Sequence, residues 1–128
     1  TYAQFRRPDR RIAAAIDAHG QWKARLAAAI ESRASEFTVE DVAKDDRCDF
    51  GAWLHAEGKH GFQSGASYQH ARDLHANFHT EAAAVLALTL TGKAKVAGGA
   101  LGPGTPFSHA SAALVATLMQ ARMAREIA

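Results

Sequence analysis

Residues Arg72–Glu81 read RDLHANFHTE and place His75 and His79 four positions apart. Nothing in the surrounding segment contradicts a helix that has Ser67 as its N-cap and runs to about Leu90. Side chains at positions i and i+4 of a helix project from one face, with Cβ atoms about 5–6 Å apart. Two imidazoles at that spacing can bind one metal ion, and a tetrahedral zinc ion needs two further ligands. The stretch therefore predicts a long helix that carries half of a metal site.

The segment Asp9–Ser35 is predicted to form another long helix. It contains no proline, and Pro8 stands where a helix entrance tolerates it. Apolar residues recur every three or four positions, as on one stripe of an α-helix, and His19 falls within that stripe. These positions are Ile12, Ile16, His19, Trp22, Leu26 and Ile30. We therefore expect His19 to be buried and available as a third ligand. If this helix packs antiparallel to the central one, His19 lies beside positions 75 and 79, near one end of the bundle.

The segment between these helices breaks into short pieces. Thr38 is expected to cap a brief helical turn that ends at Ala43, and residues Phe50–Glu57 are expected to form a second short helix. The only cysteine, Cys48, lies between the two pieces. Its position predicts a fourth ligand on a loop between the long helices.

A final helix is predicted after the glycine- and proline-rich segment Gly92–Pro106, which we expect to be a flexible connector. Thr105 followed by Pro106 resembles a helix cap and first helical position. The long helices have inward positions at helical spacing, and no stretch alternates like a strand. Those positions are Tyr68, Ala71, His75, Phe78, Ala82, Val85, Leu86 and Thr89 in the central helix, and Phe107, Leu114, Leu118 and Ala121 in the last. The pattern predicts an all-α four-helix bundle with one member broken into short helices.

The chain of 128 residues and 13.7 kDa is predicted to form a single domain, 1–128, with a connector at 91–106 and a last helix at 107–128. Its net charge is +2, from 15 basic and 13 acidic residues without a charge block, so no nucleic-acid partner is expected. One cysteine fits a reducing, cytoplasmic setting. No apolar run approaches the roughly 20 residues of a membrane span. Because the chain starts at Thr1, we expect it to be a module of a longer protein or a processed one.

Three imidazoles and one thiolate satisfy a closed tetrahedral zinc site. Buried imidazoles and the only thiol on facing elements are costly unless they share a partner, so we predict Zn²⁺ bound by His19, Cys48, His75 and His79. The remaining histidines are expected at the surface or in turns, with His70 as the substitute ligand. They are His55, His60, His70 and His109.

Three sequence blocks resemble the chemoreceptor zinc-binding domain family. The blocks are HGQWK from His19, CDFGAWL from Cys48 and HANFH from His75. They are similar to the family patterns His-x-x-Trp, Cys-x-(aromatic or Leu)-Gly-x-Trp and His-x-x-x-His, and the resemblance covers about residues 10–90. It implies the same four zinc ligands, with Trp22 and Trp53 as packing residues near the site. The long connector before the last helix departs from the family pattern.

The resemblance implies a regulatory role. Such domains are attached to bacterial chemoreceptors and diguanylate cyclases as cytoplasmic, dimer-forming sensory modules, so we expect a homodimer, an attached signalling output domain, and no enzyme activity. Four protein ligands leave no open position for substrate. The signal could be zinc availability, an oxidant that attacks Cys48, or pH. We expect the dimer interface on the apolar surface of the first and last helices.

Two alternative functions are compatible with a helical bundle. A di-iron or oxygen-binding bundle also uses histidines at i and i+4, but it needs several core carboxylates, which the acidic residues here are not placed to supply. The second alternative is a metal-free α-helical dimerisation module. Covalent haem attachment is excluded because no Cys-x-x-Cys-His occurs.

Overall fold

The computed structural model describes residues 2–127, and the side chains of residues 10–124. Within residues 2–127 the regular elements are all helical, which confirms the predicted all-α fold. The elements are α1 Tyr2–Gly20, α2 Trp22–Ser32, α3 Val39–Ala43, α4 Asp49–Glu57, the short 3₁₀ helix η1 Gly58–Gly61, α5 Gly65–Leu90, α6 Ala94–Gly99 and α7 Pro106–Ile127.

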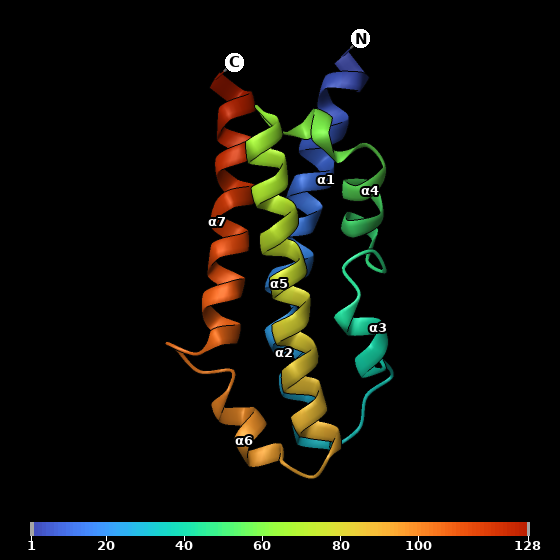
Figure 1. The fold of residues 1–128 in the computed structure, drawn as a ribbon, viewed down its shortest axis with the longest axis vertical. Helices are drawn as coiled ribbons and strands as arrows, with labels where there is room; N and C mark the ends of the chain where they lie inside the picture. The colour runs from blue at the N-terminus through green and yellow to red at the C-terminus, as the bar shows by residue number, and fades with distance from the viewer. Residues whose placement is uncertain (1, 128) are drawn as a thin grey trace.

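The helices run side by side along the long axis of the molecule (Figure 1). Helices α1 and α2 follow one another behind α5, α3 and α4 follow one another along one side, and α7 lies along the other side. Helix α5 packs against α7, α3 and α2, and α1 packs against α7. The start of α1 and the end of α7 lie at the same end of the molecule. The four-helix bundle and the dimer stay predictions.

The first long helix differs from its prediction at three points. It begins at Tyr2, well before Asp9. It is interrupted at Gln21. This residue keeps helical backbone angles, and its amide donates hydrogen bonds to the carbonyl oxygens of Asp17 and Ala18, so α1 and α2 are nearly continuous. It ends at Ser32, because Arg33 adopts a left-handed backbone conformation with φ of 58°. Periodicity did not reveal the interruption at Gln21, because the apolar stripe runs through it from His19 to Trp22.

Helix caps explain where the other elements begin. The Thr38 hydroxyl accepts a hydrogen bond from the Asp41 amide (3.1 Å), and the Thr105 hydroxyl accepts one from the Ser108 amide (3.2 Å), as predicted. Helix α5 begins at Gly65, and its cap is Ser64, whose hydroxyl accepts from the Ser67 amide at 3.0 Å. The predicted cap at Ser67 was therefore wrong by one turn.

The segment between α5 and α7, predicted as a connector, contains regular structure and core residues. It contains the short helix α6, and Ala97 and Leu101 are buried in the core. In Figure 1 this segment crosses one end of the molecule between α5 and α7. It therefore covers that end of the core with apolar side chains.

The core is built from the inward faces of the long helices. The predicted inward positions of α5 and α7 are buried or half-buried, including Phe78, Leu86 and Leu114. Burial of a large apolar side chain contributes about 1.5–3 kcal/mol relative to its exposure. This packing fixes the rotation of α5 about its axis, and with it the direction in which His75 and His79 project.

Candidate metal centre

Four potential metal ligands converge near the middle of the molecule. His75 and His79 lie about halfway along α5, His19 lies at the end of α1, and Cys48 immediately precedes α4. The exposed fractions are 2% for His19, 0% for His75 and 2% for His79, and Cys48 is half-buried. The structure brings them together as predicted, but α1–α2 and α5 run in the same direction and not antiparallel as expected (Figure 1). The site lies at mid-length of α5, however, and not near one end of the bundle as expected.

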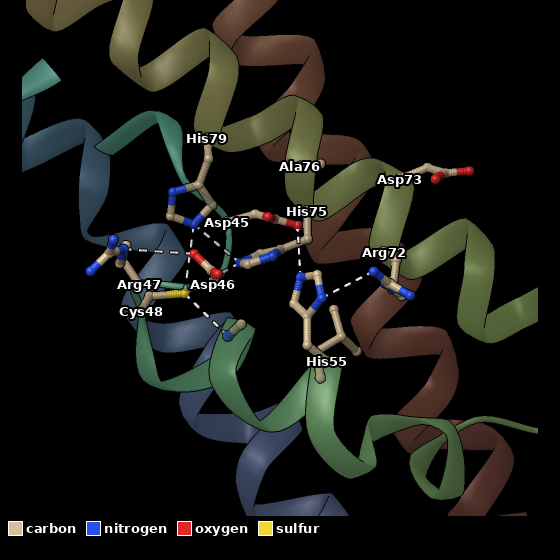
Figure 2. A network of polar contacts seen from close by, with 12 residues as sticks. Asp45, Asp46, Arg47, Cys48, His55, Arg72, Asp73, His75, Ala76 and His79 are labelled. Carbon is tan, nitrogen blue, oxygen red and sulfur yellow. Dashed lines mark hydrogen bonds and ion pairs between the residues drawn. The ribbon is translucent and has the colours of Figure 1, made fainter. Parts of the chain in front are cut away.

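The four donor atoms lie close enough together to bind one metal ion. All four lie within 4.8 Å of one another. Nε2 of His75 is 3.1 Å from Nε2 of His19 and 3.1 Å from Nε2 of His79. Sγ of Cys48 is 3.3 Å from Nε2 of His75 and 3.6 Å from Nε2 of His79 (Figure 2).

These distances match the edges of a zinc coordination tetrahedron. Zn–N bonds of about 2.0–2.1 Å and a Zn–S bond of about 2.3 Å place nitrogen ligands about 3.3 Å apart and sulfur about 3.6 Å from each nitrogen. The group contains three histidines, one cysteine and no carboxylate. Zinc accepts this donor set, whereas a di-iron site needs several carboxylates. The four residues form a potential metal site that fits zinc.

The rings of His19 and His79 are oriented by hydrogen bonds at Nδ1, the nitrogen that faces away from the other ligands. Nδ1 of His19 lies 2.7 Å from the carbonyl oxygen of Ala15, and Nδ1 of His79 lies 2.9 Å from that of Val42. A carbonyl only accepts, so Nδ1 carries the proton in both rings and the Nε2 lone pair faces the centre. Buried Nδ1 of His75 has no hydrogen-bond partner among the described residues. The polar neighbours of the His75 ring therefore gather at Nε2, which faces Cys48, His19 and His79.

Burial determines the charge of the site. Burial lowers the pKa of His19 to about 4 and that of His75 to about 2, and it also lowers the pKa of His79. The imidazoles are therefore neutral, the form that binds a metal. Burial raises the pKa of the Cys48 thiol, which favours a thiol over a thiolate. A bound cation reverses that preference, because it stabilises the thiolate directly.

Local structure explains the position of Cys48. It caps α4, and its Sγ accepts a hydrogen bond from the Gly51 amide at 3.3 Å. Backbone N–H groups at a helix N-terminus stabilise negative charge on a capping atom. The same geometry that begins α4 therefore supports a thiolate that faces the three imidazoles.

Aromatic rings surround the site. The rings of Phe50 and Phe78 lie 5.9 Å and 5.1 Å from the ring of His19. Trp22 lies 6.4 Å from His79, and Trp53 lies 5.8 Å from Phe50. Both tryptophans are buried next to the site, in agreement with the packing role that the resemblance implied. These rings pack against the imidazoles and help to bury them.

A second polar network, which sequence reasoning missed, lies beside the metal ligands. Nε2 of His55 is 3.1 Å from the Asp45 carboxylate, and Nδ1 of His55 is 3.0 Å from a guanidinium nitrogen of Arg72 (Figure 2). Because a guanidinium only donates, Nδ1 of His55 accepts from Arg72 and Nε2 donates to Asp45. The network joins α5, α4 and the 44–48 loop that carries Cys48. Only the folded structure brings these three segments together, and no spacing in the sequence indicates it.

Comparison with known proteins identifies the family. Residues 19–86, somewhat more than half of the chain, match the chemoreceptor zinc-binding domain. This match spans all four potential ligands. Searches among curated proteins and among solved structures find no match. Of the helices described, none combines the length and the apolar character needed to cross a membrane. The chain belongs to the chemoreceptor zinc-binding domain family, whose members are zinc-binding sensory domains and not a catalytic family.

Proposed function

We propose that His19, Cys48, His75 and His79 bind one zinc ion and that the domain reports on the state of this site to a signalling protein. The observation that carries the proposal is the convergence of four donor atoms within 4.8 Å in a buried position. Three neutral imidazoles and a thiolate would complete the coordination of zinc and leave no position for a substrate. A regulatory role without enzyme activity follows.

Zinc occupancy is one route by which the site could sense its surroundings. The ligands come from α1, α5 and the start of α4, and Nδ1 of His79 also contacts the Val42 carbonyl at the end of α3. Loss of zinc would remove the shared partner of these elements and loosen their packing. The change in packing would then bias an attached output domain.

Oxidation of Cys48 is the second route. The thiolate sulfur attacks one oxygen of a peroxide, an S–O bond forms, the O–O bond breaks and hydroxide leaves. The sulfur is oxidised by two electrons and the peroxide is reduced. The sulfenic acid is a poorer ligand, so the coordination rearranges at the N-terminus of α4. Cys48 would thus link an oxidant to a helix movement.

Hydrogen exchange at α3 and α4 tests these two routes. Chelation of zinc is expected to increase exchange in both helices, and peroxide is expected to do the same in wild type. A Cys48→Ser variant loaded with zinc should resist peroxide. A full response of that variant to peroxide would remove the redox route, and unchanged exchange after chelation would remove the zinc route.

We also propose that the domain works as a homodimer in the cytoplasm, attached to a bacterial signalling output domain of the chemoreceptor or diguanylate cyclase type. Helices α1 and α7 pack against each other within one chain, yet Met119 and Met123 on α7 remain 50% and 58% exposed. Residues at i and i+4 share one helix face, so the two side chains form an apolar strip suited to a second copy. Sedimentation should give a dimer, and Met123→Lys should shift it toward monomer. A wild-type monomer would contradict the dimer.

A further inference from the structure

A cavity opens from solvent onto the candidate zinc site. It has a volume of about 650 Å³ and lies between α1–α2 and the opposite wall of α3, the 44–48 loop and the start of α4. His19, Cys48 and His79 form part of its wall. Cavities of roughly 300–1,000 Å³ accommodate small organic molecules. The cavity therefore brings any occupant to the thiol of Cys48.

The walls of the cavity suit a flat apolar group. Trp22, Phe37, Val42 and Phe50 line it, and the ring of Phe37 lies 5.5 Å from that of Trp22. On α1 the lining residues are small, which leaves room for a ring system. They are Ala14, Ala15 and Ala18. Aromatic and apolar walls of this kind bury the body of a ligand but do not fix its orientation.

The charges around the cavity favour an anion. Arg11, Arg25 and Arg47 line it, against the carboxylates of Asp41 and Asp49. Nε of Arg47 also lies 3.8 Å from the carboxylate of Asp46, in an exposed ion pair that contributes little. The guanidinium of Arg25 also lies 5.4 Å from the ring of Trp22, at the apolar wall. A Zn²⁺ ion with one thiolate and three neutral imidazoles adds a further net positive charge on the same side. The cavity with zinc bound would therefore combine positive charge with an apolar surface.

We propose that this cavity binds a small organic anion with a flat apolar body and that the bound anion shields Cys48. The ring system lies against Trp22 and Phe37, and the anionic group lies among the arginines. This inference rests on the proposed zinc site, which supplies part of the positive charge. An occupant next to Sγ of Cys48 blocks the approach of oxidants, so the ligand sets how readily the thiolate reacts.

Fluorescence titration with 8-anilinonaphthalene-1-sulfonate tests the charge requirement. The matched control is N-phenyl-1-naphthylamine, which has the same ring system without the sulfonate. The zinc-loaded protein should bind the sulfonate saturably with one site per chain, and the neutral compound at least tenfold more weakly. Equal affinity for the two compounds, or no saturable binding, would overturn the proposal.

Two pairs of variants locate the probe. Ala18→Trp fills the cavity and should abolish binding, whereas Ala24→Trp adds the same ring on exposed α2 outside the cavity and should not. Arg47→Gln should weaken binding severalfold, and Lys23→Gln, an exposed charge outside the cavity, should leave it unchanged. Circular dichroism of each variant identifies any loss of fold. Wild-type binding by a folded Ala18→Trp or by Arg47→Gln would contradict the assigned site.

Shielding of Cys48 is measured as the rate of zinc release by the thiol reagent 5,5′-dithiobis(2-nitrobenzoate). A saturating concentration of the sulfonate should slow release severalfold in wild type and not in Ala18→Trp. An unchanged wild-type rate would refute shielding. Zinc content of the same samples separates the two proposals. If the protein contains zinc but does not bind the sulfonate, only the ligand proposal for the cavity is refuted. If it binds the sulfonate but contains no zinc, only the zinc-site proposal is refuted.

Discussion

The backbone of Gly51 packs directly against the backbone carbonyl oxygen of Asp45, and no β-carbon fits between them. A β-carbon at position 51 would also lie 3.1 Å from Cε1 of His75. The glycine that follows Cys48-Asp49-Phe50 thus allows the 44–48 loop to approach both α4 and α5. This close approach places Sγ of Cys48 beside the imidazoles.

Substitution of Gly51 by alanine should therefore damage the site. The new methyl group would push the 44–48 loop away from α4, with a loss of about 1–3 kcal/mol in the free energy of unfolding and weaker zinc binding. Gly65→Ala is the control, because nothing lies within 4 Å of its added carbon. Denaturant unfolding and a zinc titration measure both effects. Equal behaviour of the two variants would show that the packing at Gly51 does not hold the site.

Removal of zinc should lower the melting temperature. A ligand present at 1,000 times its Kd stabilises the folded state by about 4 kcal/mol, which corresponds to a shift of roughly 15 °C for a domain of this size. Calorimetry before and after treatment with a chelator measures the shift. Addition of zinc, but not of magnesium, should restore it. An unchanged melting temperature would mean that zinc does not support the fold.

The zinc-free protein should lose stability as the pH falls. Burial lowers the pKa of His19 from 6.5 to about 4 and that of His75 to about 2, so the unfolded chain binds these protons more readily. Their contribution is complete above pH 6.5 and is lost as the pH falls, toward pH 4 for His19 and toward pH 2 for His75, by about 1.4 kcal/mol per pH unit for each histidine. Urea unfolding at pH 7 and pH 5 measures it. His19→Gln should reduce the slope, and a wild-type curve without slope would contradict neutral buried imidazoles.

Loss of His55 should weaken zinc binding without removing a ligand. His55 joins the Asp45 carboxylate to Arg72 and so holds the loop that carries Cys48. The bonds are partly exposed, so His55→Ala should cost about 0.5–1 kcal/mol, a two- to fivefold rise in the zinc Kd. A competition titration with a chromophoric chelator measures the Kd. His70→Ala, on an exposed position of α5, serves as the control. Matching Kd values in the two variants would mean that the network does not position Cys48.

Helical periodicity and caps predicted most of the fold. The apolar stripe identified α5 and α7 with their buried faces, and Thr38 and Thr105 act as caps as expected. The helix α6 was not predictable, because it depends on how one end of the core is covered. The interruption at Gln21 was not predictable either, because the apolar stripe continues through it. Ser64 and Ser67 are both good caps by residue type, and the structure uses Ser64.

The site could be predicted in composition but not in detail. Burial of His19, His75 and His79 followed from their place on apolar stripes, and the structure brings Cys48 to them. The assignment of Nδ1 protons to His19 and His79 depends on carbonyl groups that only the folded chain supplies. The Asp45–His55–Arg72 network and the cavity depend on three or more segments meeting, which spacing within one segment does not show.

The most direct test of the central claim is the metal content of the purified protein by elemental mass spectrometry, in wild type, His79→Ala and His70→Ala. His79 contributes Nε2 to the group of donor atoms, whereas His70 lies exposed on the same helix. The account predicts about one zinc ion per chain in wild type and in His70→Ala, and loss of zinc in His79→Ala. Absence of zinc from the wild type, or equal zinc in all three proteins, would contradict it.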